Sequence, residues 1–389
     1  MSIELSELRP RPRPPMISGR EPFPVPERLQ WYVDRARAAL AEPFVGVTTD
    51  GQVVPGLFRI EPSGVSAQPL LDAALSWLGS LTNEQRSAAC FPIDSSEWRA
   101  WSNISPYLLR HGVLLESLDE TQRDLAVGLV GESLSHAGYT TARDVMRLNE
   151  TIAEMTGRFH EYGEWLYWLS IFGTPSADGP WGWQIDGHHL NLHCFVLGDQ
   201  VVMTPQFMGS EPVHAEQGKY AGTRVFEVEE SVGFSFMRGL RREQQAQASV
   251  GMQLPMDGLA TAPNDNLRLP YAGIGFSELS GQQQTALVDL IQVYVDRLRP
   301  GHAEVRLAEV KRHLADTFFA WIGACDDTSP FYYRVHSPVI LIEFDHQVGI
   351  ALDNDAPSRN HVHTVVRTPN GNDYGHDLLR QHYARHHRA

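Results

Sequence analysis

Apolar residues at helical spacing dominate the chain from about residue 27 to residue 172. The segment PERLQWYVDRARAALA places its apolar side chains on one helical face behind a proline. SAQPLLDAALSWLGSLTNEQRSAAC and DETQRDLAVGLVGESLS show the same spacing. TARDVMRLNETIAEMTG adds another amphipathic helix, which we expect to end at Gly157. This part of the chain is therefore predicted to be helical.

The pattern changes after the turn FGTPSADGPWG. The following WQIDGHHLNLHCFVLGDQVVMTPQF is typical of strands, with a turn at LGDQ. Helical spacing returns in VFEVEESVGFSFMRGLRREQQAQAS and SGQQQTALVDLIQVYVDRLRP. SPVILIEFDHQ and HVHTVVRTP then predict two strands joined by the loop VGIALDNDAPSRN, and GHDLLRQHYARHH predicts a short helix. The sequence indicates no internal repeat.

These elements predict an α+β fold, with a helical N-terminal half packed on a mainly antiparallel sheet formed by the C-terminal half. Residues 1–27 hold many prolines and are expected to form an extended arm on the surface. Residues 28–389 are predicted to form one domain. Its helical part covers about 28–172, and its sheet-containing, catalytic part covers about 173–389.

Charge and composition narrow the classes of partner. The formal charge of −15 over 389 residues argues against nucleic-acid binding and against docking on anionic membranes. The three cysteines are widely separated, which argues against a disulfide framework. The chain has no apolar signal segment and no membrane-length apolar run. We expect a cytoplasmic protein that acts on a small molecule. A homodimer is compatible with the sequence.

Histidines crowd the segment WGWQIDGHHLNLH. Alternate residues of a strand face the same side, so His189 would face one side while Asp186 and His188 face the other. Both histidines could then approach one ion only if the strand is bulged near Gly187. The alternative interpretation is a polar strand without a ligand.

A second group of histidines and carboxylates lies near the C-terminus. His361 and His363 are two residues apart, so both imidazoles project from one face of a strand. Glu343 and Asp345 share a face of the preceding strand in the same way. If the two strands pair, one polar face carries two imidazoles and two carboxylates, a donor set that suits zinc, iron or manganese, with copper as a further alternative. The competing interpretation is a chance cluster among 17 histidines.

Other familiar catalytic motifs are missing from the sequence. There is no GxGxxG after a strand, no GxxxxGK[ST] loop, no GxSxG elbow and no HExxH helix. Metal chemistry is therefore the strongest remaining route to catalysis.

The ordered segments WSNISPYLLRHGVLLESLDETQR, WGWQIDGHHLNLH, YYRVHSPVILIEFD, NHVHTVVRTPNGNDYG and DLLRQHY resemble a bacterial family of proteins of unknown function, domain of unknown function 3500 (DUF3500). The resemblance runs from roughly Leu71 to the C-terminus, although the family favours glutamate where this chain has Asp186. The resemblance implies no reaction. It implies a shared metal site made of His188, His189, Glu343, His361 and His363. Further residues that match family positions are Asn103, Arg334, Asp373 and Tyr374.

Our first hypothesis is a metal-dependent hydrolase of a small polar or aromatic molecule. A zinc-type ion lowers the pKa of bound water to about 7, which makes hydroxide available at neutral pH. Asp186 or Asp345 would act as general base or orient a ligand, and Arg334 would bind a substrate carboxylate. The residues expected to contact the substrate are Trp181, Trp183, Asn103 and Tyr374.

Two alternatives stay open. A mononuclear non-haem iron or copper oxygenase would use His361, His363 and one carboxylate, Glu343 or Asp345. A non-enzymatic binding protein would use buried histidines to sense a ligand or pH.

Overall fold

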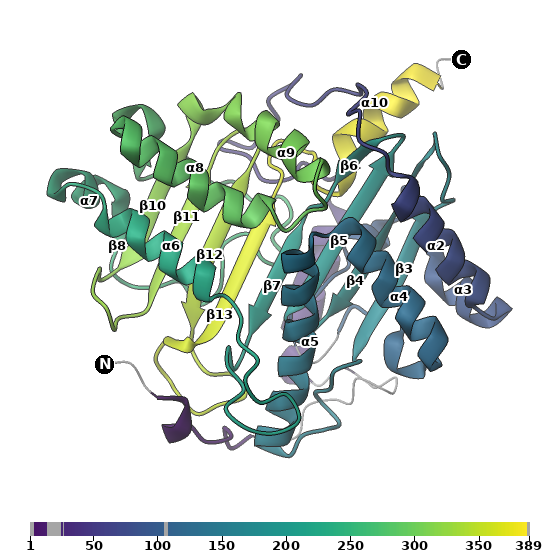
Figure 1. Cartoon of the computed structure of the whole chain (residues 1–389), viewed down its shortest axis with the longest axis horizontal. Helices are drawn as coiled ribbons and strands as arrows, with labels where there is room; N and C mark the ends of the chain where they lie inside the picture. The colour runs from purple at the N-terminus through teal and green to yellow at the C-terminus, as the bar shows by residue number, and fades with distance from the viewer. Residues whose placement is uncertain (1–3, 14–24, 26, 105–107, 387–389) are drawn as a thin grey trace.

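The computed structural model describes residues 4–13, 25, 27–104 and 108–386. Within them, thirteen strands form one mostly antiparallel sheet, and most of the ten α-helices cover one of its faces (Figure 1). The predicted α+β class is confirmed. Much of the predicted arm, namely residues 1–3, 14–24 and 26, lies outside the described residues. None of the described helices has the length and apolar character needed to span a membrane.

The helices agree well with the predicted helical segments, and α5 ends at Gly157 in the left-handed conformation as expected. Their bounds are α1 (Glu27–Ala41), α2 (Gln68–Ser80), α3 (Asn83–Ala89), α4 (Glu120–Ser133), α5 (His136–Thr156), α6 (Glu227–Arg238), α7 (Arg242–Ala248), α8 (Gly281–Val295), α9 (His302–Lys311) and α10 (His376–His386).

The strands fall into two groups along the chain. The first group is β1 (Cys90–Phe91), β2 (Val113–Leu114), β3 (Tyr167–Gly173), β4 (Pro180–Gly187), β5 (Leu190–Leu197), β6 (Gln200–Val202) and β7 (Gln206–Ser210). The second group is β8 (Ser249–Gly251), β9 (Ile274–Gly275), β10 (Phe318–Gly323), β11 (Phe331–His336), β12 (Leu341–Gln347) and β13 (Ser358–Arg367).

The strand order is symmetric about its centre. It reads β1-β3-β4-β5-β7-β13-β12-β11-β10-β8, with β2 added to β3 and β9 added to β10. In each half a short strand runs parallel to the outer long strand (β1 to β3, β8 to β10), and three further strands follow antiparallel. The two halves meet where β7 pairs antiparallel with β13. The chain therefore contains two copies of one α+β unit, related by an approximate two-fold axis.

The duplication extends to individual side chains. Gln122 lies in the first turn of α4 and donates from Nε2 to Ser80 O and Gln85 Oε1, at 2.8 and 2.9 Å. In the second half, Gln283 of α8 donates to the corresponding Gly239 O and Gln244 Oε1, at 3.0 and 2.9 Å. These matched pairs fasten equivalent helices together.

The expectation of no internal repeat was therefore wrong. The two copies share a short pattern that begins at Gly112 and Gly273, in GVLLESL and GIGFSEL. The two glycines have almost the same positive φ, 86° at Gly112 and 88° at Gly273. A Cβ at either position would lie within 2.6 Å of a carbonyl oxygen of the adjacent strand, at Leu169 and Phe319. Because few other residues are identical, the similarity lies mainly in the order of elements.

Each face of the sheet packs against a different layer. The main hydrophobic core lies between the sheet and the helices, and it contains Val362 and Val366 of β13. A smaller core lies on the other face, under loops, and contains Phe207 of β7 and Val365 of β13. We call this second side the loop face, and it is the side on which His361 and His363 lie by strand alternation.

Candidate metal centre

His188 and His189 form the turn of a hairpin. β4 ends at Gly187 and β5 begins at Leu190, and His189 has a φ of 64°. The interpretation of the segment as one strand was therefore wrong, because the chain reverses direction at His188 and His189, and His189 adopts a positive φ that a strand does not have. Asn103 O accepts a hydrogen bond from His189 N at 3.3 Å, and His189 O accepts one from Gly209 N at 2.8 Å. The turn is thus fixed between a loop and β7.

Three imidazoles converge from this turn and from β13. The Nε2 atom of His361 lies 3.1 Å from that of His189 and 3.0 Å from that of His363. The remaining pair, His189 and His363, is 3.2 Å apart. All three side chains are buried. Of the residues predicted as ligands, these three come together.

Gly209 makes room for the convergence. It lies opposite His363 in the β7–β13 ladder. A Cβ at this position would meet Cδ2 of His363 at 2.7 Å and Cδ2 of His189 at 3.2 Å. The absence of a side chain at Gly209 therefore allows the two rings to approach from adjacent segments.

The other ring nitrogens fix the orientation and tautomer of two of these histidines. His361 Nδ1 donates to Val348 O at 2.7 Å, and His363 Nδ1 lies 3.0 Å from Asp257 Oδ1. Because a carbonyl and a carboxylate can only accept, each Nδ1 carries the proton. In its neutral form each ring then presents the lone pair of Nε2 to the cluster.

Electrostatics favour neutral rings at the cluster. Burial, followed by the neighbouring histidines, lowers the pKa of His189 and of His361 well below the usual value. Neutral imidazole is the form that coordinates a metal ion.

His188 lies outside the trio. Its ring stacks on that of His189 with a centroid distance of 3.9 Å, and its Nδ1 lies 2.8 Å from Asn149 Oδ1. Burial lowers its pKa to about 3. His188 is therefore placed to support the ring of His189, and it does not point at the shared position as a ligand would.

Glu343 also lies outside the trio, although it shares the loop face. Its carboxylate accepts hydrogen bonds from Leu259 N at 3.0 Å, Ala260 N at 2.7 Å and the Tyr332 hydroxyl at 2.6 Å. Those two amides belong to the loop that carries Asp257. Glu343 thus positions the carboxylate that orients His363, and its own oxygens are already used.

Asp345 is the buried carboxylate closest in register to the trio. It is paired with His363 across β12 and β13, and its carboxylate, that of Asp257 and the His363 ring lie within 4.8 Å of one another. Neither Asp345 oxygen has a hydrogen-bond partner among the described residues. Burial, then Asp257 and Glu343, raise its pKa well above the usual value.

Asp186 lies just before the histidine turn. Its Oδ1 accepts a hydrogen bond from Ser102 N at 3.0 Å, and burial raises its pKa to about 8. The Ser102 hydroxyl lies 3.2 Å from the Tyr32 hydroxyl. The neighbouring Asn103 contacts the turn through its main chain. Asp186 and Asn103 therefore border the site by way of one loop.

The remaining predicted residues lie elsewhere. Trp181 and Trp183 point into the core between sheet and helices, where Trp183 Nε1 donates to Ser133 Oγ at 3.0 Å. They cannot wall a site on the loop face, because strand alternation directs them to the opposite side. Tyr374 donates to Asp265 at 2.9 Å and belongs to the smaller core. Arg334 faces the loop side beside Glu343, and its Nε has no partner among the described residues.

Two supporting residues could not be found from sequence spacing. Asp257 lies in a loop far from both strands, and its only sequence signal is the turn dipeptide Asp-Gly in PMDG. Val348 contributes a backbone carbonyl, which leaves no signal in the sequence at all.

A family model described as a protein of unknown function (DUF3500) matches residues 63–376. No curated protein and no solved structure matches the chain.

Proposed function

The chain belongs to the DUF3500 family, whose description supplies no reaction, and from the geometry we propose a metal-dependent hydrolase that acts on a small molecule. One observation carries the proposal. Three buried Nε2 atoms lie 3.0–3.2 Å apart, and two of the rings are oriented through Nδ1.

The donor set fits a zinc-type ion. His189, His361 and His363 would hold the ion, because nitrogens 3.0–3.2 Å apart can all lie within a Zn–N bond length of about 2.0–2.1 Å of one position. Three protein ligands are the number that catalytic zinc sites use, with the remaining position kept for water or substrate. When bound, the ion would supply a hydroxide-forming water at neutral pH.

The surrounding residues support this assignment with distinct roles. Asp257 holds His363 in the coordinating tautomer, and Val348 does the same for His361. Asp345 is buried beside His363 with both oxygens free of partners among the described residues. Its raised pKa keeps it protonated in the metal-free protein, and a bound cation would lower that pKa, so we assign to Asp345 the position that would accept a proton from the attacking water when the ion is bound. Asp186 borders the same turn and is assigned to the substrate side.

Copper or iron chemistry is the second candidate, because an all-imidazole set also suits copper and iron. An iron(II) oxygenase of the two-histidine, one-carboxylate type would need a carboxylate in place of the third imidazole. Here the third donor is His189. This difference favours the hydrolase, and oxygen consumption with iron(II) or copper would favour the alternative.

Elemental analysis of the untagged, full-length protein tests the site. We expect about one equivalent of a zinc-type ion per chain, as isolated or after reconstitution. Asp257→Asn should weaken metal affinity by about 10- to 100-fold, the usual range for a residue that orients a histidine ligand. Asp327→Asn is the matched control, because Asp327 is an exposed carboxylate that pairs with Arg238 on the surface.

Hydrolysis itself is tested with p-nitrophenyl acetate and a panel of small esters, amides and lactones. Turnover should appear on adding zinc to the metal-free protein and should be absent from His363→Ala. A protein that takes up less than about a tenth of an equivalent of any transition metal would contradict the site. A loaded protein without hydrolysis but with metal-dependent oxygen uptake would contradict the reaction alone.

A further inference from the structure

A second group of possible cation ligands lies on the loop face beside the three imidazoles. One oxygen of Asp257, one oxygen of Asp345 and one ring nitrogen of His363 all lie within 4.8 Å of one another. Asp345 is opposite His363 in the β12–β13 ladder, and Asp257 belongs to the loop that Glu343 of β12 anchors. A strand and a loop far from it in sequence thus bring two carboxylates together. We call the position between Asp257 and Asp345 the carboxylate site.

Asp345 lacks a partner for its lone pairs. Both carboxylate oxygens are buried, and neither has a hydrogen-bond partner among the described residues. Two further carboxylates, Asp257 and Glu343, act on it with the same sign of charge. A buried carboxylate without a partner is costly, so such groups normally meet a hydrogen-bond donor, a counter-ion or a metal. The structure therefore leaves Asp345 in need of a positive partner.

Neither a shared proton nor water supplies this partner. Two carboxylates that share one proton would be joined by a hydrogen bond, and Asp345 makes none to Asp257. Solvent does not reach the buried oxygens of Asp345. A bare divalent cation needs less space than water, because its bonds to oxygen are about 2.0–2.6 Å long while O–H···O hydrogen bonds are about 2.5–3.0 Å. Two oxygens on one such ion can be up to about 4–5 Å apart, which agrees with the 4.8 Å limit observed here.

Asp257 provides the open side of the carboxylate site. Its Oδ1 accepts hydrogen bonds from Gly258 N at 2.8 Å and from His363 Nδ1 at 3.0 Å, and its Oδ2 accepts one from Thr261 Oγ1 at 3.1 Å. A carboxylate has about four lone-pair sites, so Oδ2 can accept a further partner. The side chain of Asp257 is 40% exposed, whereas Asp345 is buried. Solvent and ions therefore reach this site from the side of Asp257.

We propose that Asp257 and Asp345 bind a second divalent cation of the Mg²⁺ or Mn²⁺ type, separate from the ion assigned to the three imidazoles. Carboxylate oxygens together with water are the ligands that these cations prefer. The ion fastens the loop of Asp257 to β12, and so holds the carboxylate that orients His363. Because both oxygens of Asp345 lack partners among the described residues, one can bind this ion while the other remains for the attacking water.

The two sites are chemically independent. The first ion is bound by Nε2 atoms, whereas the carboxylate site uses oxygens, and His363 supports it only through the hydrogen bond from Nδ1 to Asp257. The second cation is therefore expected whether or not the proposed hydrolase activity is found.

Titration with Mn²⁺ tests the proposal on the full-length protein, first loaded with one equivalent of zinc so that the imidazoles are occupied. The electron paramagnetic resonance signal of free Mn²⁺ measures the bound fraction. We expect one Mn²⁺ per chain. Asp345→Asn should weaken its binding by about tenfold or more, because the variant lacks one of the two anionic ligands. Asp327→Asn, at an exposed carboxylate outside the site, should leave the binding unchanged.

A third variant separates the carboxylate site from the imidazoles. His189 belongs to the trio of imidazoles and not to the carboxylate site, so His189→Ala should lose zinc but bind Mn²⁺ as tightly as the original protein. If the original protein takes up no zinc but binds Mn²⁺ in a manner that depends on Asp345, the proposed hydrolase fails and the second site is supported.

A fourth variant keeps the test independent of whether Asp345→Asn folds. The side chain of Asp257 is partly exposed, so Asp257→Asn should fold, and in the His189→Ala background it should also weaken Mn²⁺ by about tenfold or more. Unfolding temperatures report whether each variant is folded. The proposal is overturned if the zinc-loaded protein binds no Mn²⁺ up to about 1 mM, if a folded variant of Asp257 or Asp345 binds it as tightly as its parent, or if His189→Ala loses Mn²⁺ together with zinc.

Discussion

The two halves of the sheet share one architecture but carry different chemistry. Their strands have the same cross-strand register, so that the pair Gln184–His193 in the first half corresponds to Arg334–Glu343 in the second. Both pairs face the loop side. His193 is held by Pro205 O at 2.8 Å, whereas Glu343 anchors the loop that carries Asp257. The same backbone position therefore makes a local contact in one copy and holds the loop of Asp257 in the other.

The candidate metal centre depends on both copies. His189 comes from the β4–β5 turn of the first half, and the corresponding β11–β12 turn of the second half contains Pro338 and Val339 instead. His361 and His363 come from β13 of the second half. The cluster therefore forms at the junction where β7 meets β13. Neither half alone could hold the three nitrogens.

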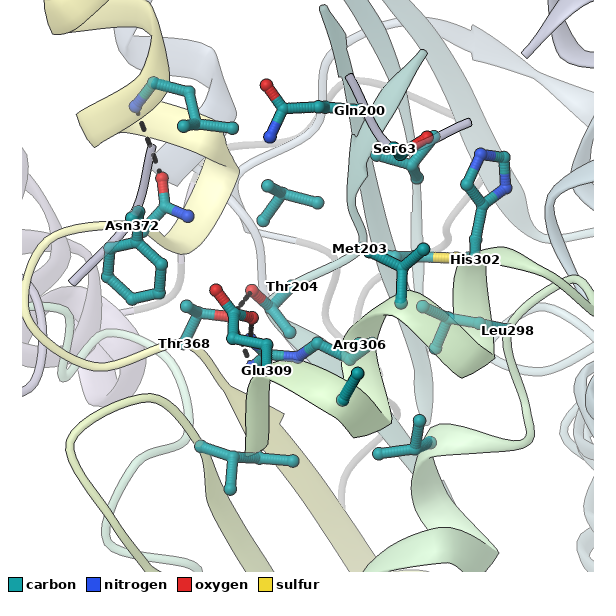
Figure 2. Close-up of a pocket in the computed structure, with 18 of the residues that line it drawn as sticks. Ser63, Gln200, Met203, Thr204, Leu298, His302, Arg306, Glu309, Thr368 and Asn372 are labelled. Carbon is teal, nitrogen blue, oxygen red and sulfur yellow. Dashed lines mark hydrogen bonds and ion pairs between the residues drawn. The ribbon is translucent and has the colours of Figure 1, made fainter. Parts of the chain in front are cut away.

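The helices differ as well as the strands. α5 spans 21 residues and packs against β5 and β7, whereas its counterpart α9 spans 10 residues and lines a cavity of about 710 Å³ (Figure 2). A duplicated scaffold thus leaves one end of the central strand pair filled by a helix and the other end hollow. The comparison shows that the shared fold fixes where the strand residues lie. The loops and the lengths of the helices then decide which of these residues border a cavity or a histidine cluster.

The largest expected effect follows from breaking the junction. His361→Ala and His363→Ala should each abolish stoichiometric metal binding, because two imidazoles alone leave the ion without its third protein ligand. Elemental analysis after reconstitution measures this. His193→Ala in the first half should lower stability but leave metal content unchanged, since His193 is anchored to Pro205 and not to the cluster. Full metal occupancy in both β13 variants would remove the site assignment.

The next expected effect concerns two equivalent positions whose titratable side chains give opposite pH dependence of stability. Asp186 corresponds in register to His336. Burial raises the pKa of Asp186 to about 8, so the unfolded chain loses this proton first and stability falls as pH rises from about 4 to 8. Burial, then Arg334, lowers the pKa of His336 to about 3, so stability instead rises as pH increases from about 3 to 6.5.

Chemical denaturation of the metal-free protein at several pH values separates the two groups. As pH rises from 4 to 8, the unfolding free energy of Asp186→Asn should increase relative to that of the original protein by up to about 1.4 kcal/mol per pH unit. The unfolding free energy of His336→Phe should increase relative to that of the original protein with a similar slope, but as pH falls from 6.5 to 3. Variants with parallel pH profiles would show that these positions are not electrostatically distinct.

Sequence reasoning succeeded where periodicity carries the information. The helices, the turn at LGDQ and the pairing of β12 with β13 follow from residue spacing, and so does the shared face of His361 and His363. It failed where one residue changes the backbone. The positive φ of His189 turns a predicted strand into a hairpin and redirects both histidines of the turn.

Long-range features were also beyond sequence spacing. The approach of His189 to β13 depends on the β7–β13 pairing, which joins the two halves across a large separation in sequence. Glu343 looked like a ligand because it shares a strand face with Asp345. Its carboxylate is instead taken by the amides of a distant loop. No local pattern encodes that contact.

A smaller effect is expected from this loop anchor. In the original protein the Glu343 carboxylate accepts hydrogen bonds from two backbone N–H groups and one hydroxyl. Glu343→Gln would place the amide NH2, which is a donor, against these donors. We expect a loss of about 1–3 kcal/mol in unfolding free energy and a weaker hold on Asp257. Proteolysis near residues 255–265 should become faster in the variant. An unchanged digestion pattern together with unchanged stability would show that Glu343 does not anchor this loop.

The smallest expected effect tests the duplication itself. Gln122→Ala and Gln283→Ala each remove a capping-box side chain that also ties two helices together, so each should cost about 1 kcal/mol, with the more deeply buried Gln122 losing slightly more. Gln282→Ala, at an exposed position of the same helix as Gln283, should be nearly neutral. Because the two pairs belong to separate halves, the double variant should lose the sum of the single losses within about 0.5 kcal/mol. Urea denaturation of the original protein and the four variants gives these values. A double loss well outside the sum would mean that the two copies do not contribute to stability as independent units.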